Sequence, residues 1–262
     1  MRIRRTLRQT RCPMPQIPFP KKKVTRALAQ AELEILELTY PKAATALHYT
    51  NPFELLIAVI LSAQCTDARV NQTTPSLFAK YPIPEKLAKA KRPDVERIIR
   101  SCGFFRMKAK NIINAARGLV SEHAGKVPSE REQLEALPGV GRKTASVVMS
   151  VAFERAEIAV DTHVFRVAHR LGLTLGKTPR DVERDLQAIV PREKWSHAHH
   201  WLILHGRAIC KAPVPRCPEC PVNAICPSAP IVAKSLKGRG PANAAAAPAL
   251  RPRRSAAAKK KR

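Results

Sequence analysis

Four cysteines near the C-terminal end of this 262-residue chain have the spacing of ligands to one inorganic centre. Cys210, Cys217, Cys220 and Cys226 follow the pattern C-x6-C-x2-C-x5-C, and the residues between them are rich in proline and suit a tight loop. Structural zinc sites usually pair two C-x2-C knuckles, whereas iron–sulfur clusters accept uneven spacing within one loop. The spacing favours a cluster and leaves zinc open. Seven cysteines, an odd number, and no secretory signal disfavour a disulfide framework.

A second group of residues suited to chemistry surrounds a glycine-containing turn. Residues 137–145, with the sequence LPGVGRKTA, join two expected helices through Gly139 and Gly141, which let the backbone turn tightly and approach a ligand. The start of the following helix suits a DNA phosphate, although an ordinary helical hairpin has the same pattern. Lys143 lies in the first turn of that helix, where the helix dipole tends to lower the pKa of its amine and favour nucleophilic attack. A lysine on a solvated helix face is the more common case.

A carboxylate follows eighteen residues after this lysine, in the segment Val160-Asp161-Thr162-His163. Asp161 can act simply as the N-cap of the helix expected over residues 162–171, a role that needs no catalysis. It can also point at the cleft that contains Lys143. The residues alone leave both roles open.

The net charge of +27 lies mainly at the two ends of the chain. Residues 1–26 carry nine Lys and Arg, residues 232–262 carry ten, and neither segment has an acidic residue, which leaves +8 for residues 27–231. We interpret both ends as disordered basic arms, because they lack the apolar periodicity of a core. Such a balance favours a polyanionic partner, nucleic acid first, over a merely sticky surface. No apolar run is long enough to span a membrane, and four prolines argue against an organelle transit peptide at the N-terminus.

Between the arms, helical periodicity predicts an all-α protein without strands or internal repeats. Asn51, Asp67 and the capping box of Ser129 with Glu132 are expected to begin helices, and Pro75 is expected to interrupt one. The predicted helices cover residues 27–40, 52–61, 67–78, 93–101, 108–123, 129–137, 142–153, 162–171, 179–190 and 197–210.

Taken together, the motifs resemble endonuclease III, a family of the helix–hairpin–helix DNA glycosylase superfamily. The resemblance rests on the glycine turn, the segment Ala159–His163, the segment His199–Gly206, the apolar segment Pro52–Gln64 and the four-cysteine loop. It implies a [4Fe–4S] cluster on the four cysteines and two helical domains with a DNA-binding cleft between them. The implied division is a six-helix barrel with the helix–hairpin–helix over residues 45–155, and a helical cluster domain from residues 27–44 and 156–231.

The resemblance also implies roles for single residues. Lys143 would be the nucleophile and Asp161 the catalytic carboxylate. Gln64 resembles the residue that fills the gap left by an extruded base, and Phe104 occupies the position of an intercalating wedge. The Phe104-Phe105 pair departs from the family, which typically has an aliphatic wedge, so the identity of the wedge stays open. The remaining DNA-contact residues implied are Gly139, Gly141, Arg142 and His163.

The implied function is that of a DNA repair enzyme. It would remove damaged, mainly oxidised, pyrimidines from double-stranded DNA and cleave the abasic strand by β-elimination through a Schiff base on Lys143. We expect a monomer that works inside the cell, at the nucleoid. The alternatives are a pyrimidine-dimer glycosylase of the same fold and a non-catalytic, cluster-containing DNA-binding protein. An adenine-mismatch glycosylase is disfavoured by Lys143.

Overall fold

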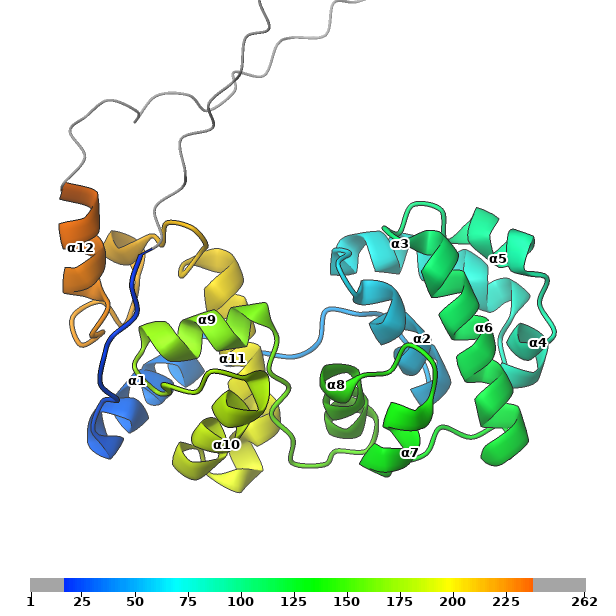
Figure 1. Cartoon of the computed structure of the whole chain (residues 1–262), viewed down its shortest axis with the longest axis horizontal. Coiled ribbons are helices and arrows are strands. Elements are labelled where there is room, and N and C mark those ends of the chain that lie inside the picture. Colours follow the sequence, from blue (N-terminus) through cyan, green and yellow to red (C-terminus); the bar gives the residue numbers. More distant parts are fainter. Residues whose placement is uncertain (1–16, 238–262) are drawn as a thin grey trace, which may run out of the picture.

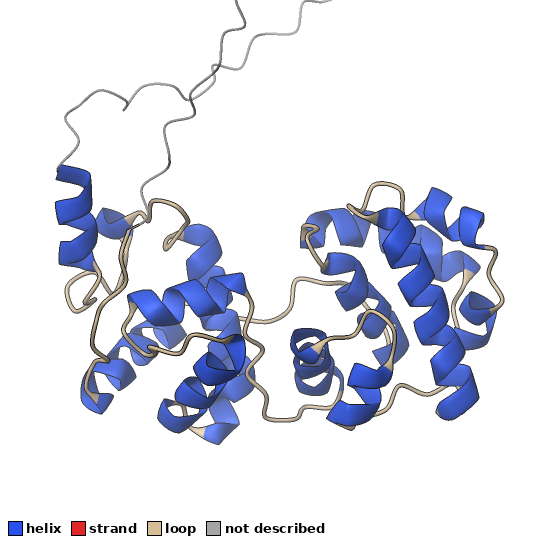
Figure 2. Cartoon of the chain, viewed as in Figure 1, coloured by secondary structure: helices blue, strands red, loops and turns tan. Residues whose placement is uncertain are grey.

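The computed structural model describes residues 17–237, and within this range every regular element is a helix (Figure 2). The prediction of an all-α protein is confirmed. Helix lengths follow the apolar periodicity, and short turns join most of them. The α-helices are α1 (Arg26–Thr39), α2 (Pro52–Ser62), α3 (Asp67–Lys80), α4 (Pro84–Ala88), α5 (Arg92–Ile98), α6 (Phe105–Glu122), α7 (Arg131–Ala136), α8 (Arg142–Ala152), α9 (Thr162–Arg170), α10 (Pro179–Ile189), α11 (Trp195–Ala208) and α12 (Ala229–Lys237).

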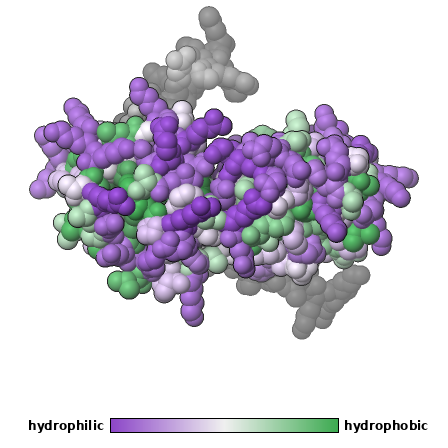
Figure 3. Space-filling view, turned by 90° about the horizontal axis from the view of Figure 1, so that it is seen from below, coloured by the Kyte–Doolittle hydropathy of each residue, from purple (hydrophilic) through white to green (hydrophobic). Residues whose placement is uncertain are grey.

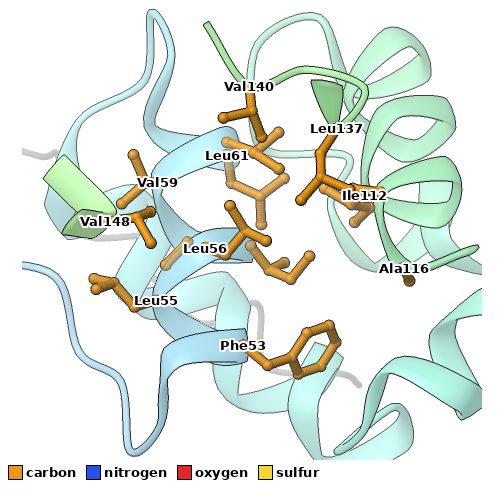
Figure 4. Packing of buried hydrophobic residues seen from close by; sticks show 14 of the residues in the cluster. Phe53, Leu55, Leu56, Val59, Leu61, Ile112, Ala116, Leu137, Val140 and Val148 are labelled. Carbon is orange, nitrogen blue, oxygen red and sulfur yellow. The ribbon is translucent and has the colours of Figure 1, made fainter. Parts of the chain in front are cut away.

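The helices form two lobes with separate hydrophobic cores (Figure 1). Helix α2 lies at the centre of the first lobe, because its residues from Leu55 to Leu61 are all buried. Side chains of α6, α7 and α8 close around it, and Ile112, Leu137 and Val148 face α2 in Figure 4. Burial of so many aliphatic side chains is the main stabilising contribution to this lobe.

The second lobe joins the N-terminal helix to the C-terminal part of the chain. Helix α1 packs on α10 and α11, and α9 packs on α10 and α11. Its core contains Leu36, Val167, Leu186 and Leu202, all fully buried. The chain therefore passes between the lobes twice, after α1 and again before α9 (Figure 1). The exact domain boundaries drawn from the sequence stay a prediction.

Several helix starts follow from capping side chains. The Oδ1 atom of Asn51 accepts a hydrogen bond from the Glu54 backbone N–H at 3.0 Å, as expected of an N-cap. The capping box expected at Ser129 is wrong: α7 begins at Arg131, and the Ser129 hydroxyl accepts from Arg155 instead. Pro75 does not interrupt α3, which runs through it to Lys80.

Parts of both segments that were expected to be disordered arms have a defined structure. Residues 17–25 lie against the second lobe, where the Val24 N–H donates to the Gly172 carbonyl at 3.0 Å and Phe19 stacks near His169. Residues 232–237 belong to helix α12, which buries Val232. The expectation of disorder is wrong for these two segments, because single apolar side chains anchor them. The rest of both arms, residues 1–16 and 238–262, lies outside the described residues.

The surface is mainly polar. The face shown in Figure 3 carries hydrophilic side chains over both lobes, with smaller apolar patches between them. Within residues 17–237, no helix combines the length and hydrophobicity needed to cross a membrane.

Candidate active site and cysteine loop

A cleft of about 620 Å³ lies between the two lobes and brings the predicted chemical residues together. Lys143 comes from the first turn of α8 in one lobe, and Asp161 precedes α9 in the other. Gln64 and His163 also line the cleft. Residues predicted from separate motifs thus share one cavity, which is wide enough for a nucleotide-sized group.

The glycine turn places Lys143 by allowing close packing. Gly139 has φ +85°, and a Cβ atom there would come within 2.9 Å of the Asn111 side chain on α6. Gly141 precedes α8, and the space around it is open, so its backbone is accessible to a ligand. Helix α8 begins at Arg142 without a side-chain N-cap hydrogen bond, so its first N–H groups lack a capping partner next to Lys143.

The surroundings of Lys143 in the cleft shift the pKa of its amine. Burial lowers its pKa below the usual value, and Arg207 lowers it further, whereas Asp161 and Asp67 raise it in part. The net direction is downward, which increases the fraction of neutral amine. A neutral amine is the form that attacks an electrophilic carbon.

The two carboxylate oxygens of Asp161 have different surroundings. Its Oδ1 accepts hydrogen bonds from the backbone N–H groups of His163 and Val164, both at 2.8 Å. The predicted N-cap is therefore present, and it fixes the orientation of the carboxylate. Oδ2 has no hydrogen-bond partner among the residues that the structure describes, and the side chain lines the cleft with Lys143. Asp161 can therefore begin the helix and act electrostatically at the same time.

Asp67 does not cap α3 as the sequence suggested. Thr66 is the N-cap, with its hydroxyl accepting from the Arg69 N–H at 3.3 Å. The Asp67 carboxylate instead accepts from Arg207 of α11 at 2.7 Å. This ion pair joins the two lobes beside Lys143.

Gln64 and Phe104 lie in neighbouring loops and share an unusual backbone conformation. Both have left-handed backbones, with φ 52° and 56°. A Cβ atom on Gly103 would lie 3.6 Å from the Gln64 carbonyl oxygen, so the two loops touch. The Phe104 side chain is 70% exposed, whereas the adjacent Phe105 packs on the core of the first lobe.

Two predicted DNA-contact residues have protein partners. Arg142 donates to both carboxylate oxygens of Glu183 on α10, at 2.9 and 2.8 Å, and so holds the lobes together. His163 accepts at Nδ1 from Arg166 at 3.2 Å and still lines the cleft. Sequence reasoning missed the Arg142–Glu183 and Arg207–Asp67 pairs, because Glu183 and Asp67 carry no local pattern that connects them to arginines on other helices.

The four cysteines of the C-terminal loop line one small pocket in the second lobe. The Cys210 sulfur lies 3.5 Å from an Arg170 nitrogen, and the Cys220 sulfur lies 3.6 Å from His205 Nε2. None of the cysteines within residues 17–237 forms a disulfide. Burial raises the pKa of Cys220 to about 11 and that of Cys226 to about 12. Thiols that are this buried need a compensating positive centre to ionise.

The arrangement of the four sulfurs bears on the kind of inorganic group that the loop could hold. Within the described residues, no three His, Cys, Asp or Glu side chains converge on one ion position. A zinc ion would need its sulfur ligands about 2.3 Å away. Sulfurs spaced around a common pocket suit a larger, multinuclear group better than a single ion.

Comparison with known proteins identifies the class first. Residues 57–192 match the HhH-GPD superfamily of base excision DNA repair proteins. This range contains the glycine turn, Lys143 and Asp161. The fold and the cleft therefore define a helix–hairpin–helix DNA repair protein.

Several curated relatives and solved structures narrow the class to a family. The chain is 50% identical to endonuclease III of Synechocystis sp. over 198 residues, which cover 75% of this chain and 90% of the relative. It also matches a non-covalent endonuclease III–DNA complex with a TM-score of 0.78 and 44% identity, covering 80% of this chain and 99% of that one. A trapped covalent endonuclease III–DNA intermediate matches with a TM-score of 0.76 and 46% identity, covering 79% and 98%. The chain belongs to the endonuclease III family, and it is a DNA glycosylase with AP lyase activity.

Proposed function

We propose that this enzyme removes damaged pyrimidines, chiefly oxidised ones, from double-stranded DNA and then cleaves the abasic strand. The observation that carries the proposal is the shared cleft of Lys143 and Asp161. Likeness to a trapped covalent endonuclease III–DNA intermediate supports covalent chemistry, because only a nucleophile can hold the DNA.

In the proposed mechanism, Asp161 acts first through its charge. Breaking the N-glycosidic bond builds positive charge on the deoxyribose, and a fixed carboxylate stabilises that charge. The two N–H groups on Oδ1 hold the carboxylate in place. The neutral amine of Lys143 then bonds to C1′, and the sugar ring opens to a Schiff base. The Schiff base acidifies C2′, so that loss of a C2′ proton expels the 3′ phosphate.

The DNA contacts follow from the exposed groups near the cleft. The open backbone at Gly141 and the start of α8 suit a phosphate. Phe104 is the proposed wedge, because its exposed ring has no packing role, and Gln64 is proposed to fill the gap left by the extruded base. We place Gly139 and His163 at the edge of this interface. Arg142 contributes indirectly, because its ion pair with Glu183 joins the two lobes that form the interface.

The group that we propose for the C-terminal loop is a [4Fe–4S] cluster held by Cys210, Cys217, Cys220 and Cys226. The fit rests on the four sulfurs that line one pocket and on their uneven spacing within one loop. When bound, the cluster would cross-link the loop and so fix its shape. The Arg170 guanidinium beside Cys210 suits a thiolate ligand electrostatically. Lys211 and Arg216 are exposed on this loop and are proposed to contact DNA phosphates, although Arg216 also pairs with Glu219 at 2.9 Å.

The enzyme is proposed to act as a monomer on nucleoid DNA, inside the cell. A panel of duplexes, each with one defined lesion, tests the substrate class. Oxidised pyrimidines should be released fastest, and an undamaged duplex should not react. Faster release of a pyrimidine dimer would assign the enzyme to dimer repair instead.

A further inference from the structure

A second, smaller cavity adjoins the catalytic cleft on the side of α11. Its volume is about 70 Å³, and it shares Lys143, Asp161 and Asp67 with the cleft. His200 and Ile203 of α11 line its other side. The cavity therefore connects the amine of one lobe with an imidazole of the other.

The imidazole of His200 is held in one tautomer. Its Nδ1 lies 2.8 Å from the Ser196 carbonyl oxygen, which can only accept, so Nδ1 carries the hydrogen. The neutral ring then has a lone pair on Nε2. No protein group in the described part of the chain forms a hydrogen bond to Nε2, although only 8% of the residue is exposed. His200 thus has an acceptor nitrogen without a partner among the described residues, on a ring that lines the cavity.

Electrostatics disfavour two cations in this space. Burial lowers the pKa of His200, and Lys143 is one of the cations that lower it further. Burial lowers the pKa of Lys143 as well. The two groups therefore share one proton more easily than they hold two. The titratable and charged groups that face His200 are His197, His199, Lys143, Arg207, Asp67 and Asp161.

The cavity can hold the water that such sharing requires. A buried water needs roughly 10–15 Å³ of cavity volume, so a cavity of about 70 Å³ has room for water. Ser62, Asp67, Asp161, Lys143 and His200 supply the polar partners that a buried water needs. An apolar cavity of this size would stay dry.

We propose that His200 and water in this cavity form a proton relay for Lys143. The proposal rests on the proposed role of Lys143 as the nucleophile. The ammonium form of Lys143 passes one proton through water to His200 Nε2, which leaves a neutral amine. The amine bonds to C1′ of an abasic sugar and forms a carbinolamine. The imidazolium then returns the proton to the departing hydroxyl, so that water leaves and the protonated Schiff base remains.

The test is the pH dependence of borohydride trapping at a preformed abasic site, under single-turnover conditions. In His200→Gln the amine must lose its proton without the relay, so the acidic limb of the profile should move to higher pH. We expect trapping to slow by about 100-fold at pH 6, the usual size of a general-base contribution, and to recover in alkaline solution. His48→Gln, at an exposed histidine that does not line the cavity, is the matched control and should keep the native profile.

A second variant leaves the imidazole in place. Ile203→Phe should fill the cavity and displace its water, and it should move the acidic limb in the same direction as His200→Gln. If His200→Gln does not fold, this variant decides the question. A native profile in a folded His200→Gln protein, or in Ile203→Phe, would overturn the relay.

Failure of the relay differs from failure of the proposed function. In His200→Gln the trapped peptide should still contain Lys143, because only the rate changes. If Lys143→Gln still traps DNA, the nucleophile is another residue, whatever the His200 profile shows. A crystal structure of the enzyme should also show water between Lys143 Nζ and His200 Nε2.

Discussion

Arg207 donates to Asp67 across 2.7 Å, and this pair joins α11 to α3 next to the Lys143 amine. The two partners act on the amine in opposite directions, because Asp67 raises its pKa and Arg207 lowers it. The two charges therefore oppose each other at the amine, and the ion pair connects the two lobes. Removing the charge of either partner should therefore shift the pKa of the Lys143 amine more than it changes the stability of the fold.

The pair predicts a pH effect with a definite sign. Asp67→Asn removes a charge that favours the ammonium form, so the pKa of Lys143 falls and the acidic limb of Schiff-base trapping moves to lower pH. Arg207→Gln removes a charge that opposes it, so the limb moves to higher pH. Trapping rates measured across pH separate the two. Shifts in the same direction would show that the pair acts only through structure.

Replacement of the nucleophile tests the reaction type. Lys143→Gln keeps the reach and polarity of the side chain but removes the amine, so borohydride trapping and strand cleavage should both be abolished. Damaged duplex should still bind, because the Gly139–Gly141 turn is unchanged. Gel shift and trapping, run on the same protein, measure both. Full trapping by this variant would exclude the lyase role of Lys143.

Replacement of the Asp161 carboxylate should impair a different step, the release of the base. Asp161→Asn keeps an oxygen that can accept from the His163 and Val164 N–H groups, so the helix and the melting temperature should be preserved. It removes the charge that stabilises the sugar cation, and base release should fall by about 10²- to 10³-fold. Trapping at a preformed abasic site should continue, because no glycosidic bond remains to be broken. Equal losses in both assays would contradict this division of roles.

Features that depend on adjacent residues were predictable from the sequence, whereas contacts between distant residues were not. The Asp161 N-cap and the glycine turn are each defined by a few adjacent residues, so both could be predicted. The Arg142–Glu183 and Asp67–Arg207 pairs join residues 41 and 140 positions apart, so no pattern along the chain announces them. Proline favours a helix break, yet Pro75 lies within α3, because the packing of Val70 and Leu77 on the core outweighs one lost hydrogen bond.

The exposed ring of Phe104 predicts a defect that is confined to base extrusion. Phe104→Ala should slow excision from duplex DNA by about tenfold or more, since unstacking costs a few kcal/mol. Cleavage at a preformed abasic site should slow less, because less extrusion work remains. Phe105→Ala is the matched control, and it should lower the melting temperature because Phe105 packs on the core. The opposite pattern would make Phe105 the wedge.

The cysteine loop predicts the composition of the purified protein. Four sulfurs with uneven spacing line one pocket, so a protein that holds the proposed cluster should be yellow-brown and contain iron and acid-labile sulfide in equal amounts. Cys217→Ser should lower the iron content and loosen the loop, which limited proteolysis near Arg216 would detect. Cys102→Ser, a buried cysteine in the other lobe, should leave the iron content unchanged. Colourless protein with one zinc per chain would refute the cluster, because zinc would then have drawn the four sulfurs onto one ion.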